Sequence, residues 1–92
     1  MSPGPGEHIH HIVEQTPGNL SRFGGNAIHN TANAVPLTVD MHIGRGSISA
    51  YYSSIDPFVS PNMTVRQFLQ SQSYDYQYRF GVDALKNFGA IK

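Results

Sequence analysis

Two stretches in the N-terminal half have the composition of short β-strands. Residues 7–15 include three β-branched positions and are followed by a Pro-Gly pair that ends a regular element. Residues 34–39 form a second run, in which Pro36 restricts a strand to a sheet edge or a strand end. Between them, the Gly- and Asn-rich segment 18–33 predicts a long loop with one short turn.

Helical spacing begins after the second run. Thr38 or Asp40 is placed to cap a short helix that carries His42. Two glycines, at positions 44 and 46, weaken this helix by about 1 kcal/mol each relative to alanine. Residues 47–54 place an isoleucine and two tyrosines at helical intervals, so the helix is expected to resume there.

Two further helices are expected in the C-terminal third. The segment Thr64-Val-Arg-Gln67 has the form of a capping box, and apolar residues follow it at helical spacing. Apolar positions also repeat at helical intervals from about residue 74 to residue 88, and Gly89 stands where a C-terminal cap belongs. The tyrosines in these patterns are expected to pack in or near the core. Short strands followed by helices predict an α+β domain.

The chain is long enough for one small domain. Its 92 residues, of which 39% are hydrophobic, support a single core. Residues 1–6 are rich in Pro and Gly and are expected to be a linker, which leaves residues 7–92 as the folded domain. No apolar run approaches the roughly 20 residues needed to cross a bilayer. We therefore expect a soluble domain with no export signal of its own and no membrane association.

Five histidines and no cysteine define the candidate chemistry, because any bound metal must be held by imidazole, carboxylate or amide groups. His10 and His11 are adjacent in the first strand, where neighbouring side chains point to opposite faces. At the end or bend of a strand, one imidazole can hold a divalent cation while the other removes a proton from water. A hydrolytic nuclease needs this division of labour.

The charge balance points the other way. Lys+Arg and Asp+Glu number six each, which argues against the broad basic surface of a protein that binds nucleic acid through many phosphate contacts. Five of the six basic residues lie after position 42, however, and a bound cation would add positive charge at the site. Arg45, three residues from His42, is the best candidate for a phosphate contact.

Several ordered segments carry a more specific signal. They are His10-His-Ile-Val-Glu-Gln15, Ala27-Ile-His-Asn-Thr-Ala-Asn33, Leu37 with His42, and Ile48-Ser-Ala-Tyr-Tyr-Ser-Ser54, with looser matches at Thr64-Val-Arg-Gln-Phe-Leu69 and Tyr78-Arg-Phe-Gly81. Together they resemble the HNH/endonuclease VII superfamily, in particular the nuclease toxin domains at the C-termini of RHS-type and other polymorphic bacterial toxins. The resemblance extends over most of the chain after residue 7.

This resemblance implies a ββα-metal unit, in which a hairpin and a following helix hold one divalent cation, with additional C-terminal helices. By position, His10 resembles a metal ligand and His11 the general base. Asn33, nine residues before His42, resembles the central asparagine, which ties the loop together by hydrogen bonds and helps to orient the base. His42 resembles the next metal ligand.

One position departs from the pattern. DNase colicins have a further histidine four residues after the helix ligand, whereas this chain has Gly46 there. His8, on the same strand face as His10, is one candidate for the missing ligand, and His29 is another, although a role for His29 in structuring the loop is favoured. Asp40 lies too close to a helix start to distinguish a ligand from a cap.

The resemblance implies an endonuclease toxin that hydrolyses phosphodiester bonds, with DNA favoured over RNA as substrate and Mg²⁺, Zn²⁺, Ni²⁺ or Mn²⁺ as its metal. It also implies a larger carrier toxin upstream, a cognate immunity protein, secretion with the carrier and action in the cytoplasm of a target cell. Two other classes remain open: a non-catalytic His-rich module that holds metal for structure only, and a protein-interaction domain such as an immunity or adaptor protein, for which a neutral charge is natural.

Overall fold

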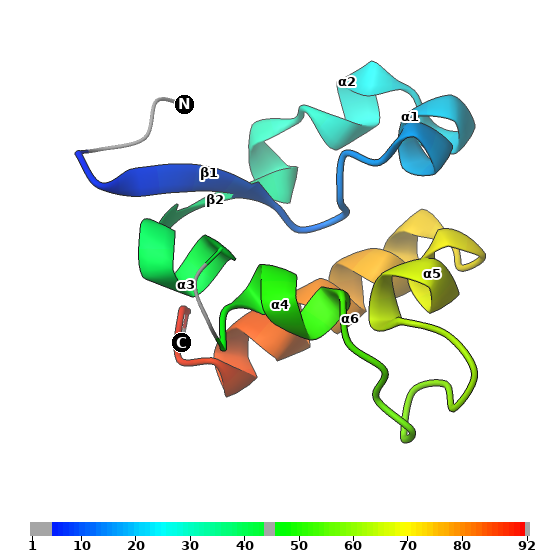
Figure 1. Ribbon diagram of the computed structural model, residues 1–92. Helices are drawn as coiled ribbons and strands as arrows, with labels where there is room; N and C mark the ends of the chain where they lie inside the picture. Colours follow the sequence, from blue (N-terminus) through cyan, green and yellow to red (C-terminus); the bar gives the residue numbers. More distant parts are fainter. Residues whose placement is uncertain (1–4, 44–45, 92) are drawn as a thin grey trace.

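The computed structural model describes residues 5–43 and 46–91 and shows a small domain of mixed helix and strand (Figure 1). This agrees with the predicted α+β class. Most of the linker expected at residues 1–6, together with Arg45, lies outside the described residues. Along the chain the elements are β1 (Glu7–His11), α1 (Pro17–Phe23), α2 (Gly25–Ile28), a 3₁₀ helix (Thr31–Asn33), β2 (Ala34–Thr38), α3 (Val39–Ile43), α4 (Ile48–Tyr52), α5 (Val65–Gln70) and α6 (Tyr74–Asn87).

The two predicted strands form an antiparallel sheet. The register runs from Glu7 opposite Thr38 to His11 opposite Ala34. Pro36 is exposed and lies opposite Ile9, which fits the prediction that proline confines this strand to a sheet edge. Helix α3 follows β2 without an intervening loop, so the pairing of the strands also fixes where α3 begins.

The connection between the strands is not the long loop that its composition predicts. It contains α1, α2 and the 3₁₀ helix, because local caps replace the missing apolar pattern. The Thr16 hydroxyl accepts a hydrogen bond from the Asn19 backbone N–H, and Pro17 stands at the first helical position, where its fixed φ is favourable. The buried amide of Asn19 then exchanges hydrogen bonds of 2.9 and 3.1 Å with the amide of Gln77 on α6.

The C-terminal helices begin and end where local signals place them. Thr64 and Gln67 form the predicted capping box at the start of α5. Helix α6 ends within one residue of its predicted end, and Gly89 follows with φ +74°. Of the five tyrosines, four are half-buried or buried as expected, while Tyr76 on α6 is 44% exposed because it lies on the outer face of the helix.

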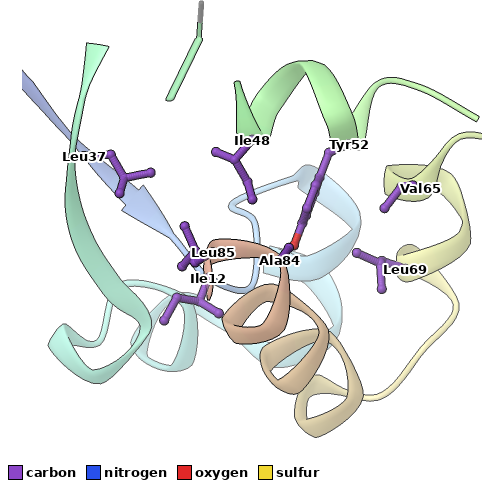
Figure 2. Packing of buried hydrophobic residues seen from close by; sticks show 8 residues of the cluster. All are labelled: Ile12, Leu37, Ile48, Tyr52, Val65, Leu69, Ala84 and Leu85. Atoms are coloured by element: carbon purple, nitrogen blue, oxygen red, sulfur yellow. The ribbon is translucent and has the colours of Figure 1, made fainter. Parts of the chain in front are cut away.

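The apolar core lies between the sheet and the C-terminal helices (Figure 2). Its buried members are Ile12, Leu37, Ile48, Tyr52, Val65, Leu69, Ala84 and Leu85. Helix α6 packs closely against the chain just after β1, at Gly81. A Cβ atom at Gly81 would stand 2.7 Å from Ile12 Cγ2 and 2.8 Å from the Ile12 carbonyl oxygen. Only glycine leaves room for this contact, which joins the helices to the strand that carries the paired histidines.

None of the described helices is long and apolar enough to cross a bilayer.

Candidate functional site

Three histidines meet where the sheet contacts α3. The alternation along β1 places His8 and His10 on one face of the strand, and α3 brings His42 against that face. Nδ1 of His8 lies 3.1 Å from Nδ1 of His42, and the rings of His10 and His42 pack edge to face with centroids 5.3 Å apart. Residues 34 positions apart in the chain thus form one imidazole cluster.

His10 is the buried member of this cluster. It is 4% exposed, and its Nε2 atom has no hydrogen-bond partner among the described residues. Burial, with added repulsion from His42 and then His11, lowers the pKa of His10 to about 4. The imidazole is therefore neutral at pH 7, which is the form that binds metals. A buried polar nitrogen left unpaired costs about 1–3 kcal/mol, so this atom is either a site of strain or a site for a ligand.

The contact between His8 and His42 is compatible with two arrangements. One ring can donate its Nδ1 proton to the other, which the 3.1 Å separation allows. Alternatively, both nitrogens can face one cation, since two imidazole nitrogens bound to a tetrahedral metal at 2.0–2.1 Å lie roughly 3.3 Å apart. Burial, followed by repulsion from His8 and His11, lowers the pKa of His42 and favours the neutral form that either arrangement requires.

Chemistry and spacing of this cluster fit a divalent cation, but the ligand set is incomplete. Across residues 5–43 and 46–91, no group of three His, Asp or Glu side chains is arranged to hold a metal ion. The cluster offers two nitrogens at ligand spacing, and a third imidazole, that of His10, packs against His42.

A small cavity lies beside the cluster, and His11 reaches it although its side chain faces the other side of β1. The cavity has a volume of about 130 Å³ and is lined by Ile9, His10, His11, Glu14, Gln15 and His42. His11 pairs with Ala34 at the last position of the sheet register, so the chain turns after it and the strict alternation of faces ends. Its half-buried ring contacts the edge of His29, with centroids 5.3 Å apart. Burial, and next the proximity of His29, lowers the pKa of His11, so the ring is neutral at pH 7 and able to accept a proton.

Glu14 is a member of the cavity to which the sequence patterns assigned no role. Its carboxylate accepts hydrogen bonds from Nε of Arg66 at 3.0 and 3.1 Å and from Nη2 at 2.9 Å. Nη1 of Arg66 donates to the Ser53 hydroxyl at 2.7 Å. A forked guanidinium contact fixes a carboxylate in both position and orientation. The one signal in the sequence is that Glu14 lies within the same six-residue segment as the paired histidines.

Asn33 is fully buried and ties the connecting segment together. Its Oδ1 accepts from the Val13 N–H at 2.7 Å, while its Nδ2 donates to the carbonyl oxygens of Val13 and Ile28 at 3.0 and 2.9 Å. The Asn33 carbonyl oxygen also accepts from the Ile12 N–H at 2.8 Å. These are the loop-tying hydrogen bonds that the sequence analysis expects. Asn33 does not line the cavity, so it acts on His11 only through the backbone that follows it.

The other candidates lie away from the cluster. Gly46 is exposed with φ +74°, a backbone conformation outside the α-helical range, so position 46 is not on the helix face that presents His42. His29 contacts His11 and lies apart from the other three histidines, while the Asn30 side chain caps the 3₁₀ helix. Asp40 is exposed in the first turn of α3, where the Thr38 hydroxyl accepts from the Met41 N–H and acts as the cap.

Comparison with known proteins does not identify the chain: no family model, no curated protein and no solved structure matches it. The function therefore has to be inferred from the arrangement of the cavity residues.

Proposed function

We propose that the chain is a metal-dependent endonuclease of the HNH type, in which β1, β2 and α3 form a ββα-metal unit. The observation that carries this proposal is the cluster of His8, His10 and His42 between β1 and α3, with His11 beside it on the same small cavity. The lowered pKa values of His10 and His42 favour the neutral form that binds a metal, and the lowered pKa of His11 favours the form that accepts a proton. These are the two tasks of metal-assisted hydrolysis.

His42 and His8 would hold the cation through Nδ1, and His10 is the third ligand candidate because its buried Nε2 has no other described partner. Mg²⁺, Mn²⁺, Ni²⁺ and Zn²⁺ are the candidates, of which imidazole ligands favour Ni²⁺ and Zn²⁺. When bound, the cation would supply positive charge that stabilises the phosphate and the departing oxygen.

His11 would act as the general base. Its ring nitrogen takes a proton from water as the water oxygen forms a bond to phosphorus, and the bond between phosphorus and the 3′ oxygen breaks. The lowered pKa of His11 supports this role, since the ring stays unprotonated at neutral pH. Asn33 fixes the backbone after His11 through its two side-chain hydrogen bonds to Val13 and through its carbonyl oxygen, which accepts from the Ile12 N–H, so it is a positioning residue.

Glu14 has a related positioning role in this proposal. Arg66 already satisfies both of its oxygens, so the carboxylate is held beside the cavity rather than free to rotate into it. Because Arg66 neutralises this charge, the contribution of Glu14 is to hold its part of the cavity wall in place.

DNA is the proposed substrate, with a carrier toxin upstream and a cognate immunity protein as partners. These partners, together with secretion and action in a target-cell cytoplasm, rest on the motif resemblance alone. Arg45 is kept as the proposed phosphate contact because it lies three residues from His42 in the sequence.

Nicking of supercoiled plasmid tests the proposal. The purified domain is assayed with Mg²⁺, Mn²⁺, Ni²⁺ or Zn²⁺ and with EDTA, beside His11→Ala and the control Phe58→Ala, whose ring is 99% exposed and does not line the cavity. We expect cleavage that requires metal, is lost in His11→Ala and is retained in Phe58→Ala. Titration calorimetry with each metal completes the test: His10→Ala and His42→Ala should weaken binding, and His11→Ala should not.

The absence of cleavage of both DNA and an RNA control under every metal would reject the nuclease. Metal binding without cleavage would then favour a His-rich structural metal site, and the absence of both would favour a protein-interaction domain. If His11→Ala removed metal as completely as His10→Ala, the assignment of ligand and base would be wrong.

A further inference from the structure

A second and larger cavity lies between α4, the loop that follows it and the C-terminal part of α6. Its volume is about 430 Å³, within the range of roughly 300–1,000 Å³ typical of small-molecule sites. It shares no lining residue with the histidine cavity. The rings of Tyr51, Phe80 and Phe88 and the carboxylates of Asp56 and Asp83 line it, together with Asn87 at the end of α6.

The aromatic wall is an ordered group of rings. Tyr51 and Phe80 are nearly parallel, with an interplanar angle of 4° and centroids 6.4 Å apart. Phe88 is tilted by 52° against Tyr51 at 5.8 Å. The face of an aromatic ring carries partial negative charge and attracts a cation that lies against it.

The carboxylates add full negative charge to this wall. Asp56 is fixed, because its Oδ2 accepts from the Tyr51 hydroxyl at 2.7 Å and its Oδ1 from the Phe58 N–H at 3.0 Å. The carboxylate of Asp83 is exposed and forms no hydrogen bond or ion pair with any part of the chain that the structure describes. Among the described residues, no basic side chain lines the cavity to neutralise these charges.

The end of α6 contributes in the same direction. The cavity includes Asn87 and Phe88, the last residue and the C-cap of this 14-residue helix. The C-terminus of a helix carries the negative end of the macrodipole and favours a nearby cation. Burial, followed by the hydrogen bond to Asp56, raises the pKa of Tyr51 to about 12, so the hydroxyl stays protonated and continues to hold the Asp56 carboxylate at neutral pH.

We propose that this cavity binds an organic cation, a guanidinium or ammonium group whose aliphatic stem lies against the rings. The source that the surface favours is an Arg or Lys side chain of a partner protein. Phe58, whose backbone is held by Asp56, is 99% exposed, and Ile55 beside it is 58% exposed. These two side chains can make apolar contacts with the segment of the partner protein that carries the Arg or Lys residue.

Amide-resolved NMR titrations of the whole chain test this site with N-acetyl-arginine amide and N-acetyl-lysine amide. The neutral controls are N-acetyl-citrulline amide, which is isosteric with the arginine compound, and N-acetyl-norleucine amide, which keeps the aliphatic chain of lysine without its ammonium group. We expect the cations, but not the neutral controls, to shift the resonances of Tyr51, Phe80 and Phe88. Asp83→Asn should weaken binding by about threefold to tenfold, and Asp56→Asn similarly, as expected for the loss of one partly exposed charge pair.

Asp75→Asn is the matched control, because Asp75 is an exposed carboxylate on the same helix, outside the cavity. It should leave the affinity unchanged. A peptide with the arginine between two leucines separates the sources: tighter binding than arginine amide indicates a protein partner, and equal binding indicates a small free cation. No response at tens of millimolar, equal response to citrulline, or an equal effect of Asp75→Asn would overturn the proposal. EDTA is present throughout, so the result does not depend on the proposed nuclease.

Discussion

The histidine end of the molecule (β1, β2 and α3) and its helical half (α4, α5 and α6) contribute very differently to the fold. Six of the eight residues of the buried apolar cluster come from the helical half, and the two strands supply only Leu37. Each of the three helices is capped by a side chain, from Ser47, Thr64 and Ser73. The histidine end instead buries a polar ring, that of His10, which is 4% exposed. A two-stranded hairpin is marginal by itself, so the candidate chemistry depends on a framework built elsewhere.

The largest expected effect separates chemistry from stability. His11→Ala should reduce metal-dependent cleavage by about 10²–10⁴-fold, because it removes the proposed general base. The ring is half-buried, so the midpoint of urea unfolding should change little. Initial rates and urea titrations on the same preparation measure both quantities. A large fall in stability with only a small loss of rate would assign His11 to the framework.

The next largest effect is expected on the stability of the fold. Leu85 on α6 is fully buried, so Leu85→Ala should lower the free energy of unfolding by about 2–5 kcal/mol. If the histidine end depends on the helical half, the NMR signals of both regions should disappear together as urea is added. A histidine end that kept its signals after α6 had unfolded would contradict that dependence.

Lowering the pH should reduce the free energy of unfolding through the histidines of the histidine end. The pKa of His10 is about 4 in the folded chain against an ordinary value of 6.5, so the unfolded chain binds a proton more readily. The contribution of His10 to the free energy of unfolding is therefore fully present above about pH 6.5. It is lost, by on the order of 3 kcal/mol, as the pH drops toward 4. The lowered pKa values of His11 and His42 act in the same direction.

Urea titrations in EDTA at pH 7.5, 5.5 and 4.5 measure this loss, with His10→Gln as the comparison. The variant should lose less stability than the parent chain over the same range. Equal losses in the two proteins would show that His10 does not cause the acid sensitivity.

The smallest effect tests a cap in the helical half. Thr64→Ala removes the hydroxyl that accepts from the Gln67 N–H at 3.1 Å, and should cost about 1 kcal/mol. Thr31→Ala, at an exposed position of the 3₁₀ helix, is a control without a capping role. Thermal unfolding of the two variants distinguishes them, and an equal change in both would remove the capping box from the account of stability.

The elements that could be predicted are those whose signals are local. The capping box at Thr64 and Gly89 after α6 lie within a few residues of the ends they define. The period of two along β1 was enough to place His8 beside His10. Helix α1 was missed because its seven residues, from Pro17 to Phe23, offer few apolar positions and include a glycine. What holds α1 in place is the amide pair of Asn19 with Gln77, 58 residues away.

For the candidate site too, the local features could be predicted from the sequence and the long-range contacts could not. The interval from Asn33 to His42 and the strand face of His8 and His10 were available from the sequence, and the structure brings His8, His10 and His42 together. The contact of Glu14 with Arg66 was not available, because it joins residues 52 positions apart. The second cavity was hidden for a similar reason, since it depends on how α6 packs beside α4 and the loop after it.

Gly81 places a limit on how this protein can vary. A methyl group there would press on both the side chain and the carbonyl oxygen of Ile12, the residue next to His11. Random substitution at position 81 should therefore return glycine almost alone, even though the residue has no side chain to contribute to hydrolysis. If the strand were to yield to alanine instead, the proposed base His11 would move with it, and displacements near 1 Å cost about a hundredfold in rate. Under the proposed function, selection for cleavage would then act at position 81, which does not line the histidine cavity.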